Sequence, residues 1–532
     1  MEHSSAIFSA AEKQEPHRQH LTFATDLSFL LGSHPVPPPK LKHLESPYEW
    51  TRHYKGVLTG VSCIATLFAS FAASCYSPGA AQMEAEWHVS QVASLVGITT
   101  FTGGFAIGPM FLAPFSEIYG RKPVFIATAI LFAICQVCCA VTRLYSGMLV
   151  ARFFCGIGGS TFSTMVGGVM ADIYHSQNRN APMALFSWAA LFGTGLGPLV
   201  CGFISQYTGW RWIFYIQIII AGLITAAVLA FFRETRGPVI LCEKARRLNE
   251  WHRAMEADAA ATAAGEQTAQ DTDRQELRRM DMVRWQVAAD AERAGILQLL
   301  RTSLLRPFTM LFTEPVVFFF SLWAAFSWSV LYINLSAIPL VFETAYSFSL
   351  SSANAIFAAS CIGSTVALAL CLVQESLATS FWYTRKRDHQ SMWNSVPEHR
   401  LYFSCVESLL LPLGLFLFGW SAQYQVHWIV PAVAVGISTV GIFSIYLSVF
   451  NYLADTYHRY ASSALAAQSF CRNMLGGVFP LISRQMFTHL GFGAAASLLG
   501  GVGMALTLVP WILVWCGPFI RRRSKLAREI MD

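Results

Sequence analysis

An acid, a glycine and two cations stand close together in a short segment between two long apolar runs. They are Glu117, Gly120, Arg121 and Lys122. Gly120 permits a tight backbone turn because glycine has no Cβ. The guanidinium of Arg121 can donate hydrogen bonds to a carboxylate at the end of a neighbouring helix, and Asp172 is the candidate. We expect this ion pair to clamp one end of the molecule in one conformational state and to break in another.

A further arginine is isolated within an apolar run. Arg152 follows Leu-Val-Ala and precedes Phe-Phe-Cys, and the glycines Gly156, Gly158 and Gly159 come next. A charged side chain at the centre of a bilayer costs about 2.5 to 3.5 kcal/mol even on the mildest scale. We therefore expect Arg152 to face a cavity or a polar partner. In the alternative interpretation it lies near the end of its helix and extends its charged head to the interface.

The composition indicates that much of the chain does not face water. Of 532 residues, 54% are hydrophobic and 13% are charged, whereas a soluble domain carries about 25% charged residues. Most of the 13 cysteines stand in apolar runs without the paired spacing of a metal site, so we interpret them as small buried hydrophobic residues. The sequence also contains no Gly-x-x-x-x-Gly-Lys-Ser/Thr phosphate loop, which argues against ATP hydrolysis.

Twelve apolar stretches are long enough to cross a bilayer. A transmembrane helix needs about 20 mostly apolar residues because the hydrocarbon core is about 30 Å thick. The predicted spans are 56–76, 92–115, 122–142, 146–171, 182–206, 211–232, 313–340, 350–374, 401–420, 427–451, 461–484 and 491–517. They fall into two six-helix halves, 53–232 and 307–517, which predicts an all-α membrane protein.

Polar segments flank and separate the two halves. Residues 1–52 have the composition of a disordered tail, because they cannot bury enough apolar surface to fold alone. Residues 233–306 form a predicted linker without an extended apolar core, with an amphipathic helical pattern over 272–300. A short polar tail follows at 518–532. Lys and Arg gather in these segments and in the loops on the same side, which predicts that both termini and the linker are cytoplasmic.

The Glu117 segment resembles the loop signature of the major facilitator superfamily, in which an acid precedes Gly-Arg-Lys. Ala113 stands where the general pattern has a glycine. The resemblance implies a role in gating, whereas a simpler interpretation makes Arg121 and Lys122 ordinary determinants of topology. Arg152 and its glycines resemble the family's Arg…Gly-x-Gly pattern, which implies a part in proton coupling.

The second half resembles the fungal drug:proton antiporters, the twelve-span branch of the same superfamily. Its motifs include Pro397-Glu398-His-Arg400-Leu401 and Asn451-Tyr452-Leu-Ala-Asp455. Similar motifs continue in order over roughly 50–528. The resemblance implies the major facilitator fold.

One predicted span carries a sign of transport direction. Gly193, Gly197, Pro198 and Gly202 resemble the antiporter motif Gly-x-x-x-Gly-Pro-x-x-Gly-Gly, and Cys201 replaces the first glycine of the final pair. Small residues four apart let another helix approach closely, and proline removes a backbone donor and bends the helix. The resemblance implies export rather than uptake.

Several polar and aromatic residues within the spans are candidates for a substrate cavity, although each alone could serve as an interhelical contact instead. They are Trp188, Tyr332, Asn334, Asn451 and Gln468. Glu407 and Arg472 are further ionisable residues within spans, and neither receives a role. The middles of the first, fifth, seventh and eighth spans contain no acid, which favours an apolar or amphipathic substrate over a polyamine.

The resemblance implies a proton-coupled exporter, not an enzyme, that works by alternating access. Its substrate would be a hydrophobic or amphipathic drug, toxin, glycolipid or self-made secondary metabolite. We expect a monomer in the plasma membrane, rather than the vacuolar membrane, that binds substrate, protons and lipid but no cofactor, metal or nucleic acid. The alternatives are a transporter of polyamines or other small solutes, and a non-transporting membrane sensor.

Overall fold

The computed structural model describes residues 17–27, 36–41, 43–175, 178–265, 283–287, 296–383, 401–457 and 460–523. It divides into two compact units. The larger, here called the bundle, combines 52–233 with 296–532, and the smaller, here called the cap unit, combines 1–51 with 234–295. Each is described by itself.

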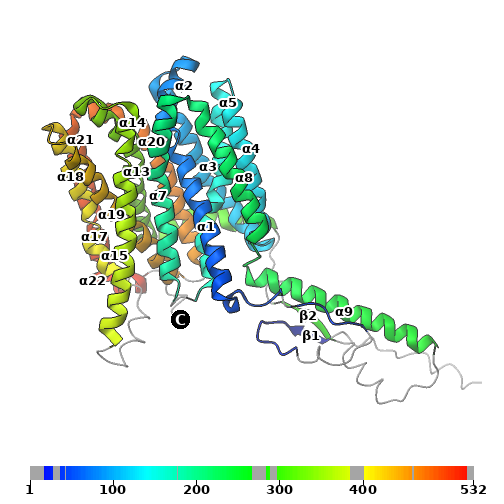
Figure 1. The fold of residues 1–532 in the computed structure, drawn as a ribbon. Coiled ribbons are helices and arrows are strands. Elements are labelled where there is room, and N and C mark those ends of the chain that lie inside the picture. The colour runs from blue at the N-terminus through cyan, green and yellow to red at the C-terminus, as the bar shows by residue number, and fades with distance from the viewer. Residues whose placement is uncertain are drawn as a thin grey trace, which may run out of the picture. The chain divides into compact units, whose positions relative to one another are not determined.

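The first half of the bundle is a set of long helices joined by short turns (Figure 1). The π-helical turn η4 links α5 to α6, so these two helices act as one span. The elements are α1 (Arg52–Ser74), α2 (Ala80–Trp87), α3 (Gln91–Ile118), α4 (Arg121–Val141), α5 (Tyr145–Ser160), η4 (Thr161–Met165), α6 (Val166–Ile173), α7 (Asn180–Tyr207) and α8 (Trp210–Phe231).

The second half of the bundle repeats this plan, with one additional helix before its first span. The elements are α12 (Ile296–Thr313), α13 (Pro315–Tyr346), α14 (Leu350–Ala355), α15 (Ala358–Tyr383), α17 (Tyr402–Glu407), α18 (Leu410–Gln423), α19 (Ile429–Tyr457), α20 (Ala461–Leu490), α21 (Phe492–Leu506) and α22 (Leu508–Arg523). Figure 1 shows these helices in green to red beside the blue to blue-green helices of the first half.

Each of the twelve predicted spans coincides with a helix or a pair of consecutive helices. Eleven of these, in the part of the chain that the structure describes, are long and apolar enough to cross a membrane. The exception is α20, whose 30 residues are sufficient in length. Its polar residues lower its hydropathy, and they include Gln468, Arg472 and Asn473, all buried. Because these side chains face other helices instead of lipid, α20 has the character of an interior helix.

Glycines allow α3 and α5 to touch backbone to backbone. A Cβ on Gly156 would overlap the carbonyl oxygen of Phe101, and a Cβ on Gly104 would overlap that of Phe153. Gly156 belongs to the pattern that follows Arg152 in the sequence. Small residues at such crossings are typical of helices packed within membranes. The crossing fixes the position of Arg152 between its neighbours.

The cap unit contains more structure than the sequence predicted. Strand β1 (His17–His20) pairs in parallel with β2 (Val283–Gln286), and α9 (Gly237–Gly265) packs beside them. Leu21, Leu248 and Trp285 form the centre of its small apolar core. The expectations of a wholly disordered tail and of a helix through 283–286 are therefore wrong for these residues. Neither segment has a sufficient core alone, but the tail and the linker bury their apolar residues together.

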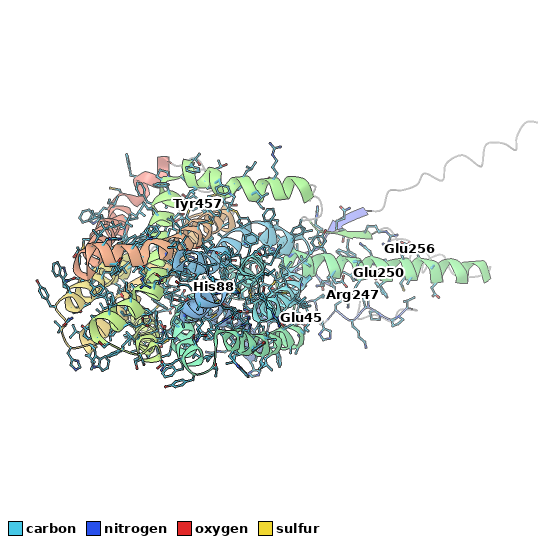
Figure 2. The ribbon with its side chains drawn as sticks, turned by 90° about the horizontal axis from the view of Figure 1, so that it is seen from above. Glu45, His88, Arg247, Glu250, Glu256 and Tyr457 are labelled. Atoms are coloured by element: carbon cyan, nitrogen blue, oxygen red, sulfur yellow. The ribbon has the colours of Figure 1, made fainter. Side chains whose placement is uncertain are left out.

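Polar contacts complete the cap unit. The side chain of Asn249 on α9 accepts from the backbone N–H of Trp285 at 2.9 Å and donates to its carbonyl at 2.9 Å. Arg246 and Arg247 lie one turn after Glu243, and the hydrogen bond from Arg246 lowers the pKa of that carboxyl. Figure 2 shows Arg247 along the exposed length of α9.

Candidate functional site at the interface of the two halves

The predicted partners Arg121 and Asp172 lie together. Arg121 Nε is 3.1 Å from Asp172 Oδ2, and its Nη1 donates to the hydroxyl of Ser116 at 3.2 Å. Gly120 has a φ of 100°, a left-handed conformation that favours glycine, and it directly precedes α4. The contact joins the start of α4 to the end of α6 within the first half. Glu117, on the last turn of α3, is exposed.

A second ion pair at this end, here called the Arg121 end, joins the two halves. Arg179 Nη2 lies 3.0 Å from Asp455 Oδ1. Beside it, Asn451 Nδ2 donates to Asn180 Oδ1 at 3.3 Å. In the sequence, Arg179 stands among the cations of the short loops. The pairing spans 276 residues, and no local pattern in the sequence indicates it.

The halves also touch at the opposite end, here called the His88 end because α2 stops there. The hydroxyl of Ser77 donates to the carbonyl of Leu335 at 2.8 Å. The backbone N–H of Ser351 donates to Gln206 Oε1 at 2.6 Å. Polar contacts therefore join the two halves at both ends of their interface.

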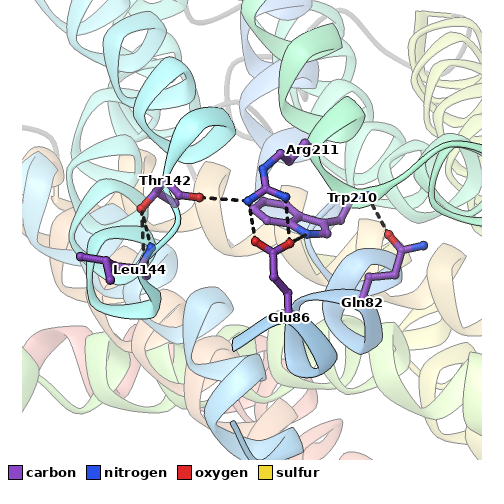
Figure 3. Close-up of polar contacts among 6 residues, drawn as sticks. All are labelled: Gln82, Glu86, Thr142, Leu144, Trp210 and Arg211. Atoms are coloured by element: carbon purple, nitrogen blue, oxygen red, sulfur yellow. Dashed lines mark hydrogen bonds and ion pairs between the residues drawn. The ribbon is translucent and has the colours of Figure 1, made fainter. Parts of the chain in front are cut away.

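A network within the first half anchors the His88 end (Figure 3). Arg211 donates to both carboxylate oxygens of Glu86, at 2.8 and 2.5 Å, and Trp210 Nε1 donates to Glu86 at 2.9 Å. Gln82 Oε1 accepts from the backbone N–H of Trp210 at 2.7 Å. The network fixes α2 to the start of α8.

Arg152 is fully buried and well supplied with acceptors. Its guanidinium donates to the carbonyls of Ala72 at 2.9 Å, Gly97 at 3.2 Å and Ala73 at 3.4 Å. Ala72 and Ala73 lie in the last turn of α1, where carbonyls lack helical partners and the helix dipole is negative. These carbonyls are polar partners of the kind that a charge in an apolar run requires, and the guanidinium is buried rather than extended to the molecular surface. Arg152 ties α1, α3 and α5 together.

The glycines of the antiporter-like motif face two different partners. A Cβ on Gly193 or Gly197 would overlap backbone atoms of α1, in the same half. A Cβ on Gly202 would overlap the side chain of Asn354 on α14, in the other half. Pro198 lies inside α7 between these two surfaces. Helix α7 thus packs closely against both halves.

Two of the candidate cavity residues make contacts between the halves. Trp188 Nε1 donates to the hydroxyl of Thr365 on α15 at 3.1 Å. Asn451 makes the amide contact at the Arg121 end described above. Both side chains are therefore held in the interface of this closed structure.

The other candidates lie in the second half, and two of them, Tyr332 and Gln468, are on the helices that carry the buried Arg472 cluster. Tyr332, Asn334 and Gln468 are buried on α13 and α20. Gln468 is one turn before Arg472, whose guanidinium carbon lies 4.3 Å from the centre of the Trp328 ring. The polar character of α20 was the available sequence signal for this cluster.

Comparison with known proteins agrees with this architecture. The family model described as Major Facilitator Superfamily matches residues 62–480. The transporter paaT of Penicillium rubens is 33% identical over 91% of this chain and 82% of its own length. Multidrug transporter TPO1_2 of Candida glabrata is 30% identical over 91% of this chain and 78% of its own length. The efflux pump radE of Floropilus chiversii, a further relative in sequence, is 31% identical over 90% of this chain and 83% of its own length.

The fold is also that of a solved transporter. The xylose transporter XylE from E. coli superimposes with a TM-score of 0.57 at 16% identity, over 86% of this chain and 99% of that one. The chain therefore belongs to the major facilitator superfamily, and it is a multi-pass secondary transporter of small molecules, not an enzyme.

Proposed function

We propose that this transporter exports a hydrophobic or amphipathic small molecule in exchange for protons, from the cytoplasm across the plasma membrane. The observation that carries this proposal is the interface closed at both ends. Polar contacts join the halves at each end, and the Arg179–Asp455 pair among them remains accessible to water, so one end can separate while the other stays joined. Alternating access between two such halves is the established logic of secondary transporters.

The direction of transport rests on α7. Its glycines match the antiporter motif, and they hold α7 against α1 and α14 at once. A helix packed this closely on both halves limits how far they separate. The relatives include an efflux pump and a multidrug transporter, which supports export.

Proton coupling rests on the family and on Arg152. Because the carbonyls of Ala72 and Ala73 belong to α1, any movement of α1 against α5 changes the environment of the buried cation. The resulting change in local electrostatics is a means of linking protonation to conformation. We further propose that the Arg121–Asp172 pair is a gate on the cytoplasmic side, with both termini on that side and the monomer as the working unit.

The proton gradient supplies enough free energy for this task. One charge crossing 100 mV gives about 2.3 kcal/mol, and one pH unit gives about 1.4 kcal/mol. Together they give about 3.7 kcal/mol, enough for a gradient of several hundredfold when a neutral substrate is exchanged for one proton.

Transport in proteoliposomes with an imposed proton gradient tests the proposal. A panel of an amphiphilic dye with a carboxylate, a neutral amphiphilic dye and spermidine would be offered with and without an uncoupler. We expect the dyes to move against their gradients only without the uncoupler. Movement that ignores the uncoupler would contradict proton exchange. Movement of spermidine alone would favour a polyamine transporter, and no movement at all would favour a sensor.

A further inference from the structure

The guanidinium of Arg472 is buried at the centre of the second half without hydrogen-bond partners. Its exposed fraction is 0%, and Nε, Nη1 and Nη2 make no hydrogen bond within the part of the chain that the structure describes. Arg152 is equally buried but donates to three carbonyls. Since an arginine stays charged in proteins, leaving it unpaired costs several kcal/mol. Arg472 therefore has unused binding capacity.

Aromatic rings offset only part of this cost. The guanidinium carbon lies 4.3 Å from the ring centre of Trp328 and 4.8 Å from that of Tyr446. A desolvated cation–π contact contributes about 2 kcal/mol. These contacts use the charge of the guanidinium but leave its N–H donors unbound.

Further polar atoms near Arg472 are also unsatisfied. Gln468 lies four residues earlier on α20, on the same face of the helix. Its side-chain oxygen and nitrogen are both buried without a partner among the described residues, and so is the hydroxyl of Tyr446. Buried polar groups are normally hydrogen-bonded. Several unsatisfied groups around one cation indicate a site that a ligand completes.

The described carboxylates on the helices that carry the Arg472 cluster lie too far along those helices to pair with Arg472. Two acids stand at the two ends of α13. Glu314 is 14 residues from Trp328 and Glu343 is 15 residues from it. At a rise of 1.5 Å per residue, each is about 21 Å or more from Trp328 along the helix. On α19, Asp455 is about 13 Å beyond Tyr446 by the same measure. Helix α20 itself contains no acid. Within the described parts of α13, α19 and α20, no carboxylate is therefore placed to pair with Arg472, and a bound anion could fill that role.

The cluster borders the interface between the halves, where a transported molecule passes. Phe186 of α7 packs on Tyr446 with ring centres 6.4 Å apart. One turn beyond Arg472, the carbonyl of Gly477 accepts from the hydroxyl of Thr99 on α3 at 2.7 Å. Separation of the halves at either end would expose this surface.

We propose that Arg472 and Gln468 bind the carboxylate of an organic substrate whose aromatic or apolar body lies against Trp328 and Tyr446. The inference rests on the proposed function in that it specifies the class of exported molecule as an anionic amphiphile. A guanidinium binds a carboxylate through two parallel hydrogen bonds, and the Gln468 amide supplies one more donor. The aromatic faces provide contact area for the body of the molecule.

Equilibrium binding to the full-length protein in nanodiscs tests this site without any proton gradient. The probes are 1-naphthylacetate and its neutral counterpart 1-naphthylacetamide, measured by calorimetry. We expect the acid to bind at least tenfold more tightly than the amide, which corresponds to about 1.4 kcal/mol. Arg472→Gln should remove this preference, and Gln468→Leu should reduce it severalfold.

Two further variants keep the test interpretable. Arg484→Gln removes the same charge from an exposed position of α20 and should leave the preference intact. Arg472→Lys keeps the charge but cannot form two parallel hydrogen bonds to one carboxylate. We expect this variant protein to bind the acid with intermediate affinity. A thermal unfolding curve for each variant shows that it is folded.

Three results would overturn the proposal: equal affinity for acid and amide in the unaltered protein, an undiminished preference in Arg472→Gln, or displacement of the acid by chloride alone. The last would assign the site to an inorganic anion. Because binding is measured without transport, a failure here leaves proton-coupled export of other molecules standing. Likewise, failure of transport in the proteoliposomes leaves the binding result valid.

Discussion

Arg179, in the loop before α7, and Asp455, near the end of α19, form an ion pair that joins the two halves at 3.0 Å. Their side chains keep exposed fractions of 18% and 23%. An ion pair that water reaches contributes about 0.2 to 1 kcal/mol. Such a contact stabilises closure of the Arg121 end without preventing it from opening, which is what a reversible gate requires.

Breaking this pair should shift the Arg121 end toward the open state. For Asp455→Asn we expect the open population to rise about 1.4-fold to fivefold, the equivalent of 0.2 to 1 kcal/mol. Hydrogen exchange over 451–457 should accelerate accordingly. The exchanged pair Arg179→Asp with Asp455→Arg should restore slow exchange, and Arg143→Gln, at an exposed loop arginine, is the control. If the exchanged pair stays fast, the contact is not what holds this end closed.

The two fully buried arginines should respond in opposite ways to neutralisation. Arg152→Met leaves three carbonyls without their donor. We expect the free energy of unfolding to fall by at most about 1.5 to 3 kcal/mol for each charged hydrogen bond that is lost, with a lower unfolding temperature. Arg472→Met removes an unpaired charge and supplies apolar volume, which should leave stability unchanged or raise it. Thermal unfolding of both proteins in the same detergent measures this. A marked loss of stability in Arg472→Met would mean that Arg472 has a structural partner.

Arg152→Lys separates charge from geometry in the proposed coupling. A lysine keeps the positive charge but lacks the planar guanidinium, whose nitrogens donate to carbonyls of α1 and α3 and so link both helices to α5. We expect dye transport to fall about tenfold while surface expression stays normal. The measurement is the ratio of proton flux to dye flux in proteoliposomes. Full transport by Arg152→Ala at normal expression would reject a role for this residue in coupling.

The close contact between α7 and α1 should not tolerate a side chain. In Gly197→Val the new methyl groups would overlap Phe71 and Ser74, and such overpacking costs about 1 to 3 kcal/mol. We expect a lower unfolding temperature and reduced export. Gly222→Val on α8 is the matched control because a Cβ there meets no atom within 4 Å. Equal effects of the two substitutions would show that packing at Gly197 is unimportant.

In the cap unit, Asn249 should hold β2 in place. Asn249→Ala removes both hydrogen bonds to the backbone of Trp285, each worth about 1 kcal/mol. We expect faster hydrogen exchange over 283–287 and earlier proteolytic cleavage there. Glu250→Ala, at the exposed neighbouring position shown in Figure 2, should change neither. Unchanged exchange in Asn249→Ala would mean that β2 is held by its strand pairing alone.

The spans were predictable because their signal is local. A bilayer requires about 20 mostly apolar residues in succession, and eleven of the twelve stretches contain them within one window of the described chain. Even α20, the most polar of them, was recognised. The Arg121–Asp172 pairing was also predicted, because it joins a helix start to a nearby helix end in a motif of known geometry.

The cap unit was not predictable in this way. Leu21 and Trp285 are separated by more than two hundred residues and by an entire six-helix half. Each of their segments is too polar to fold alone, so composition indicated disorder. Only the pairing of β1 with β2 and the packing of α9 bring enough apolar surface together.

The sequence by itself determined the membrane class and the spans, with starts within a few residues and some ends six to nine residues early, since hydropathy and helix length act along the chain. Only the tertiary structure decided which buried charges are satisfied. Arg152 and Arg472 both stand in predicted spans, yet one meets the free carbonyls of α1 and the other meets only aromatic rings. The difference arises from which helix ends and which faces come together in three dimensions, and the spacing of residues along one helix does not contain that information.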